Sequence, residues 1–156
     1  MRRIVVALLL LFPFFAFSQS FINKDKQQVK ALLDKYKTAP GFENPQFSET
    51  DSTIRFSVKD SSGIGTDFIY QFDKAGKCQM ETTQASCDSC FKKYLDHALS
   101  QQQYGWKKIN ENQYISKYQK KMMIELPAEK NDFSFMIIRT DWSKKIYRLL
   151  TSKQPV

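Results

Sequence analysis

Residues 53–59 run Thr53-Ile54-Arg55-Phe56-Ser57-Val58-Lys59, a strict alternation of polar and apolar side chains. Successive side chains of a strand point to opposite faces of a sheet, so this alternation predicts a strand with one buried face. The stretch 61–65 then turns the chain, and Phe68, Tyr70 and Phe72 form the inward-facing set of a second strand. Together these residues predict the first hairpin of an antiparallel sheet.

The next turn predicts the register of a third strand. Residues 73–76, Asp-Lys-Ala-Gly, are typical of a type I turn closed by a left-handed glycine. A strand after this turn is expected to pair Phe72 with Cys78 and Tyr70 with Met80. In that register the side chain of Cys78 faces the core.

Two stretches of the chain carry apolar residues at helical spacing. The first runs from about residue 24 to residue 37 with Asn23 as its cap, and the second runs from Asp88 to about Gln103. Their apolar stripes are Val29, Leu32, Leu33 and Tyr36 in the first helix and Phe91, Tyr94, Leu95, Ala98 and Leu99 in the second. Residues 41–51 between the first helix and the first strand are expected to be a polar connection.

Three more strands are expected after the second helix, over residues 113–126, 133–140 and 146–150, although Ser143 could instead cap a short helix over the last. Residues 19–86 and 87–156 then each give one helix and three strands. This leaves open a tandem α-β-β-β pseudo-repeat and an α+β domain without duplication. Either way we predict the α+β class, with an antiparallel sheet and two helices on one of its faces.

The first eighteen positions, residues 1–18, have the pattern of an export signal. Arg2 and Arg3 precede an apolar run that ends at Phe17, and Ala16 and Ser18 are the small residues that signal peptidases require. A run of about fourteen residues is shorter than the roughly twenty needed to span a bilayer. We therefore expect cleavage near Ser18/Gln19, a periplasmic or secreted protein, and a single domain over residues 19–156 without a transmembrane segment.

The charge of the chain is carried mostly by lysine. There are 24 lysine and arginine residues against 16 aspartate and glutamate residues, and arginine after residue 18 occurs only at Arg55, Arg139 and Arg148. Recognition of phosphates and bases favours the planar guanidinium, so scattered lysine argues against a nucleic-acid site. Attraction to anionic envelope surfaces is physically permitted by this charge, but no motif encodes it.

Cys87 and Cys90 form a CxxC motif at the predicted start of the second helix. A helix N-terminus stabilises a thiolate, which suits a redox pair, but Asp88 lies between the sulfurs and the flanks lack a βαβ pattern. In an oxidising compartment a passive disulfide is favoured. A full strand of roughly 20 Å separates Cys78 from this pair, so Cys78 is expected to be a buried free thiol.

Metal and cofactor chemistry has little support in the sequence. The single histidine, His97, is expected on the solvent side of the second helix, and it lies about 10 Å from Cys90 along the helix axis. These residues are too far apart for a shared zinc ion. A catalytic triad is equally unsupported, so no metal and no cofactor are expected.

The sequence therefore favours a small exported non-enzymatic domain that binds a protein or an envelope component. The expected binding surface is the sheet face opposite the helices, with Arg55, Lys117, Tyr118 and Arg139 as candidate contacts. The alternative is a thiol–disulfide redox protein that uses Cys87 and Cys90. A third hypothesis is a structural part of a larger assembly.

Overall fold

The structure, a computed structural model, describes residues 20–38, 43–60, 62–129 and 132–152. The expected signal peptide, residues 1–18, lies outside these ranges. The described fold therefore begins at Ser20.

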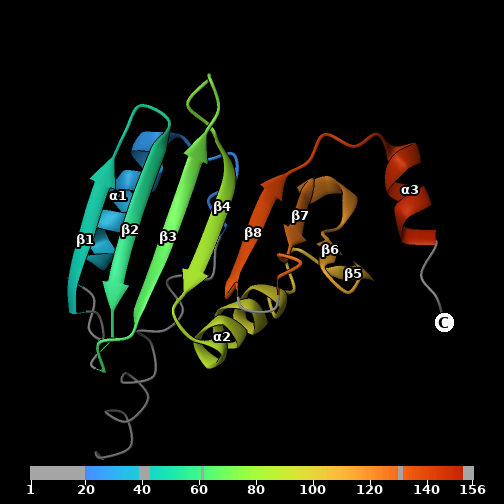
Figure 1. Ribbon diagram of the computed structural model, residues 1–156. Helices are drawn as coiled ribbons and strands as arrows, with labels where there is room; N and C mark the ends of the chain where they lie inside the picture. The colour runs from blue at the N-terminus through green and yellow to red at the C-terminus, as the bar shows by residue number, and fades with distance from the viewer. Residues whose placement is uncertain (1–19, 39–42, 61, 130–131, 153–156) are drawn as a thin grey trace, which may run out of the picture.

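Eight strands of the described chain form one antiparallel sheet (Figure 1). They are β1 (Glu43–Glu49), β2 (Thr53–Lys59), β3 (Gly65–Phe72), β4 (Cys78–Ala85), β5 (Lys107–Asn110), β6 (Gln113–Ile115), β7 (Met122–Glu125) and β8 (Ser134–Arg139). Their order across the sheet is β1-β2-β3-β4-β8-β7-β6-β5, so β1 and β5 are the edge strands. With the helices, this confirms the predicted α+β class and antiparallel sheet.

Three α-helices accompany the sheet in the described ranges: α1 (Lys26–Tyr36), α2 (Asp88–Leu99) and α3 (Lys144–Ser152). The cap of α1 is Asp25 rather than the predicted Asn23, and the Asp25 N–H donates to the Gln28 side chain at 3.1 Å. Asn23 instead has a φ of 68°, a left-handed conformation that asparagine tolerates and that turns the chain before the helix. The prediction of α2 was correct at its start and four residues too long at its end, 103 against 99.

Several strand predictions were wrong. Residues 43–49, expected to be a connection, form β1, which pairs on one side only and needs little apolar alternation. The stretch 113–126 is not one strand, because a 3₁₀ turn (Tyr118–Lys120) separates β6 from β7 and Lys121 after it has a φ of 50°. Residues 146–150 lie in α3, with the Ile146 N–H donating to the Ser143 hydroxyl at 3.3 Å, and β5 was not predicted at all.

The register of the third predicted strand is correct at its start and shifted by one residue after it. Phe72 pairs with Cys78 as predicted, but a bulge between Gln71 and Phe72 then pairs Tyr70 with Glu81 instead of Met80. A shift of one residue exchanges the two faces of a strand. Glu81 therefore shares the face of the buried Tyr70, and Met80 lies on the opposite face.

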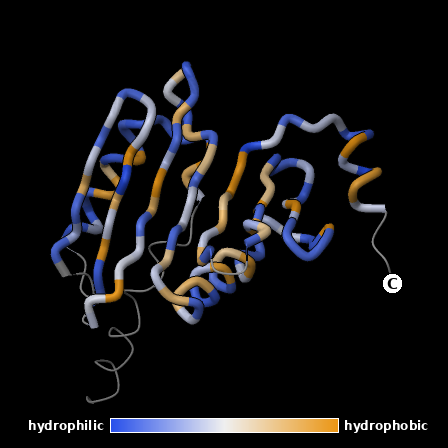
Figure 2. The backbone as a smooth tube through the Cα atoms, viewed as in Figure 1, coloured by the Kyte–Doolittle hydropathy of each residue, from blue (hydrophilic) through white to orange (hydrophobic). Residues whose placement is uncertain are grey.

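The core combines the inward faces of the strands with α1 and α2. Ile54 and Phe56 of β2 are completely buried together with Val29 and Leu33 of α1. Figure 2 shows hydrophobic residues interleaved with hydrophilic ones along the strands, as the alternation at residues 53–59 predicts. Leu95 of α2 belongs to the same buried cluster.

Residues 20–25, here called the N-terminal strap, pack against the core and bury Phe21 and Ile22 in it. The Asn23 N–H donates to the Cys78 carbonyl at 2.8 Å, and the Cys78 N–H donates to the Lys24 carbonyl at 2.9 Å. These bonds hold the strap beside the start of β4. The ring of Phe21 is buried against Tyr70.

Candidate functional site

A group of apolar side chains lies on the sheet face opposite the core. Each member alternates along its strand with buried core residues such as Phe68, Ile124 and Phe135, and each is half-buried. We call this group the methionine patch, and it consists of Ile69, Met80, Met123, Met136 and Ile138. It spans β3, β4, β8 and β7, the middle of the sheet.

Strand pairing brings the members of the methionine patch together. Met80 pairs with Ile138, and Ile138 pairs with Met123, so these three form one row across three strands. In the next row Ile69 and Met136 both pair with Thr82. Directly paired side chains on one face have Cβ atoms about 5 Å apart. The two rows are neighbours on the sheet, and Thr82 lies between Ile69 and Met136 in the second row.

Charged and polar side chains border the methionine patch. Arg55 pairs with Ile69, and its Nε lies 4.0 Å from an Asp67 carboxylate oxygen. Glu125 pairs with Met136 on the other side. An apolar centre with a polar rim is the usual anatomy of a protein–protein interface.

The four binding residues expected from the sequence do not come together. Arg55 borders the patch, but Arg139 lies two residues from the buried Ile137 on the core side, where its guanidinium donates to Asp73 at 2.6 Å. Lys117 and Tyr118 lie in the turn between β6 and β7. The patch itself was missed because the predicted register turned Met80 inward.

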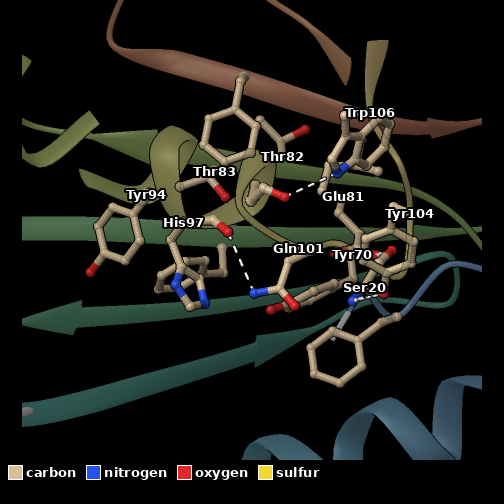
Figure 3. A pocket seen from close by; sticks show the side chains of 15 residues that line it. Ser20, Tyr70, Glu81, Thr82, Thr83, Tyr94, His97, Gln101, Tyr104 and Trp106 are labelled. Atoms are coloured by element: carbon tan, nitrogen blue, oxygen red, sulfur yellow. Dashed lines mark hydrogen bonds between the residues drawn. The ribbon is translucent and has the colours of Figure 1, made fainter. Parts of the chain in front are cut away.

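A small cavity lies on the other face, between α2 and the sheet (Figure 3). Its volume is about 70 Å³, and its aromatic lining is Phe21, Phe68, Tyr70, Tyr94, Tyr104, Trp106 and Phe135. A cavity that accommodates benzene has roughly 150 Å³. This one is therefore too small for an organic ligand in the observed conformation.

Glu81 is the one carboxylate that lines this cavity. Its Oε1 accepts hydrogen bonds from the Ser20 hydroxyl and, at 2.8 Å, from the Ile22 N–H. Burial raises the pKa of Glu81 to about 7, although the hydrogen bonds from the strap act in the opposite direction. These bonds connect Oε1 of Glu81 to Ser20 and Ile22 and so help to hold the strap against β4.

The prediction that His97 lies on the solvent side of α2 is wrong. His97 does not point to solvent but lines the cavity, where its Nε2 is buried without a hydrogen-bond partner in the described structure. Figure 3 shows Ser20, Glu81 and Tyr104 together at one end of the cavity and His97 with Tyr94 at the other. His97 and Glu81 are therefore not a paired acid and base.

The CxxC motif forms a disulfide between Cys87 and Cys90, with Cα atoms 5.2 Å apart. Cys87 is the N-cap of α2, and its Sγ accepts a hydrogen bond from the Cys90 N–H at 3.1 Å. Cys78 is a free thiol with no exposed surface, and burial raises its pKa far above the usual value. A thiol in that setting is unreactive.

The described residues were also assessed for metal-ligand clusters and for helices long enough to span a membrane. No three histidine, cysteine, aspartate or glutamate side chains among these residues are grouped to hold a metal ion. No helix of the described chain has the length and apolar character to cross a membrane.

Comparison of the chain with protein-family models, with curated proteins and with solved structures gives no match.

Proposed function

We propose that this protein is an exported, non-enzymatic domain that binds a partner protein on the helix-free face of its sheet. The observation that carries the proposal is the methionine patch, five apolar side chains in two neighbouring rows that remain half-buried on that face.

The position of the helices supports this proposal. Lys37, the C-cap of α1, lies over the ring of Phe47, and Tyr94 of α2 packs edge-on against Phe68 at 5.4 Å. Phe47 and Phe68 both pair with Phe56, so their rings lie on the same face of the sheet. We infer that α1 and α2 cover this one face and leave the methionine patch uncovered.

The chemistry of the patch favours a protein partner. Methionine is unbranched and polarisable, and it adapts to partner surfaces of different shape. The Arg55–Asp67 pair and Glu125 at the rim can orient a partner by charge, while the apolar centre supplies most of the affinity.

Export and internal repetition belong to the same proposal. Cleavage near Ser18/Gln19 leaves intact every hydrogen bond that begins at Ser20. We also interpret residues 19–86 and 87–156 as a pseudo-repeat, since each begins with a helix followed by four strands, with α3 added at the end of the second. The strand order is symmetric about the β4–β8 pair, which agrees with this interpretation.

Site-specific photo-crosslinking in producing cells tests the proposal. A benzophenone amino acid at Gln84, an exposed residue on the patch side of β4, is expected to give one discrete adduct with a partner protein. The same probe at Ala31, exposed on α1, is the control and is expected to give none.

Substitutions in the patch complete this test. The Met123→Gln and Met136→Gln double variant keeps side-chain length and should reduce the adduct roughly tenfold, because burying the amides costs affinity. The matched Met123→Leu and Met136→Leu variant should retain it. Equal crosslinking from both probe positions, or an adduct unaffected by glutamine, would refute the proposed surface.

A second candidate function is thiol–disulfide exchange, favoured by the hydrogen bond from the Cys90 N–H to the Cys87 sulfur. In the reduced protein this donor and the helix N-terminus would stabilise a Cys87 thiolate. The thiolate attacks a substrate disulfide, and Cys90 then displaces the reduced substrate as the Cys87–Cys90 disulfide re-forms.

Insulin reduction in the presence of dithiothreitol separates the two candidate functions. Under the binding proposal we expect the protein and its Cys87→Ser/Cys90→Ser variant to give the same background rate. A rate that exceeds the background and falls to it in the variant would establish the redox function instead.

A further inference from the structure

Helix α3 has no buried residue, unlike α1 and α2. Ile146 is 46% exposed and Leu149 is 55% exposed. They are three residues apart and so lie on the same side of the helix. Among the large hydrophobic residues elsewhere in the described chain, only Ile64 is also exposed, at 37%.

All charged residues of α3 are basic. Lys144, Lys145 and Arg148 are exposed, and the helix contains no acidic residue. The adjacent turn between β6 and β7 adds the exposed Lys117 and Lys120. Asp141, just before the helix, lies 3.6 Å from Lys121.

Aromatic contacts fix α3 to the rest of the fold. The Tyr147 ring lies 5.5 Å from that of Tyr118 in the lysine-bearing turn, and Tyr147 and Trp142 line a small crevice with the buried Ile115. Figure 1 shows α3 at the β5 end of the sheet, far from α1 at the β1 end. The helix is thus held on one side, while Ile146 and Leu149 point away from the body.

We propose that α3 is a docking element for an anionic phospholipid bilayer. Ile146 and Leu149 enter the boundary between headgroups and acyl chains, and the basic residues of α3 and of the neighbouring turn contact the lipid phosphates. A basic amphipathic helix with exposed aliphatic residues is the usual form of such an element. This surface is separate from the methionine patch, and the inference does not depend on the proposed function.

Charge complementarity favours a bilayer over a second copy of the chain. Pairing two α3 helices would bring two sets of lysine and arginine together, whereas anionic lipid neutralises both the helix and the turn. Two aliphatic residues on a helix of nine make a shallow anchor. The association is therefore expected to be reversible and strongly dependent on salt.

Vesicle sedimentation tests the inference with the chain that lacks residues 1–18, since the fold begins at Ser20 and the apolar signal would itself bind lipid. We expect binding to vesicles of phosphatidylglycerol and phosphatidylcholine, and roughly tenfold weaker binding to phosphatidylcholine alone. Raising the salt to about 0.5 M should release most of the protein, because the Debye length then falls well below 10 Å.

Two variants of α3 are expected to weaken the binding roughly tenfold each: Ile146→Gln/Leu149→Gln and Lys144→Gln/Lys145→Gln/Arg148→Gln. Their side chains are exposed, so circular dichroism should show an unchanged fold. Ile64→Gln and Lys35→Gln/Lys74→Gln are the matched controls, from exposed sites elsewhere, and should bind like the parent.

Three results would overturn the inference. The first is an absence of binding to phosphatidylglycerol vesicles, and the second is an equal loss of binding in the controls. The third is self-association in analytical ultracentrifugation that Ile146→Gln/Leu149→Gln abolishes, because it would assign the exposed face of α3 to a second copy.

Discussion

Replacing Phe21 by alanine is expected to lower the free energy of unfolding by about 3 to 4 kcal/mol. Phe21 is only 4% exposed, and its ring meets that of Tyr70 edge to face at 5.1 Å between centroids. Alanine would remove this contact and leave a cavity between the strap and β3. The loss should appear in urea unfolding as a lower midpoint with an unchanged slope.

The matched control for this prediction is Phe47→Ala. Phe47 is half-buried on edge strand β1, with the ammonium of Lys37 4.7 Å from its ring centre. Its loss should cost about 1 to 2 kcal/mol, because part of the ring is already in water. If Phe21→Ala cost no more than Phe47→Ala, the strap would not be part of the core.

A large stability loss from Phe21→Ala would also limit where an export signal can be removed. The strap begins at Ser20, two residues after the expected cleavage position at Ser18. Ser20 itself donates hydrogen bonds to Glu81 and to Tyr104. A mature chain shortened by only a few more residues would lose Phe21 and those bonds together. The fold therefore depends on a chain that retains Ser20 and Phe21.

The sequence predicted β2, β3 and the turn after β3 well because local patterns determine them. The alternation in β2 and the turn at residues 73–76 are short-range features, and both appear in the structure with the predicted Phe72–Cys78 pair. Edge strands are different. β1 and β5 each pair on one side only, so their sequences need less apolar alternation and give little signal.

The candidate sites were harder to predict because they depend on one bulge. The extra residue of the bulge is Gln79, which lies on β4 between the partners of Phe72 and Gln71, and it is neither glycine nor proline, so the shift has no local sequence signal. Yet that shift turns Glu81 toward the strap and Met80 onto the methionine patch. A register error of one residue therefore hid both sites.

His97 and α3 were misjudged for reasons of helix geometry. His97 is three residues after Tyr94, so a slightly wider apolar stripe on α2 would have placed it at the cavity. A strand over residues 146–150 would place the side chains of positions 146, 148 and 150 on its inward face. Position 148 is an arginine, so the strand pattern fits this stretch poorly. Helical spacing at 146, 149 and 150, together with the Ser143 cap, was the better signal.

The second large effect expected is a fall in stability with rising pH that depends on Glu81. Its pKa of about 7 in the folded protein lies above its ordinary value of 4.5, so the folded state binds more protons than the unfolded state between these values. Linkage then requires the free energy of unfolding to decrease as the pH rises through this range, by about 3 kcal/mol in all. Urea unfolding at intervals between pH 4.5 and 8 measures the slope.

Other carboxylates act in a different pH range. Hydrogen bonds and neighbouring cations lower the pKa of Glu49, Asp60 and Asp73, so the stability that they contribute is lost only as the pH falls below about 4. Their effect on stability has the opposite sign to that of Glu81. The range between pH 5 and 7 therefore isolates the buried carboxyl.

Glu81→Gln removes the ionisation while keeping the bonds of the strap, because the amide oxygen can still accept from Ser20 and Ile22. We expect the variant to match the parent near pH 5 and to be about 2 to 3 kcal/mol more stable at pH 8. Glu111→Gln, at an exposed carboxylate between β5 and β6, should keep the slope of the parent.

A flat pH profile of the parent's stability, or the parental slope in Glu81→Gln, would mean that burial of the Glu81 carboxyl does not control the pH dependence. In that event the strap would be held mainly by Phe21 and by its backbone bonds to Cys78, and the Phe21→Ala loss would be the same at pH 5 and pH 8.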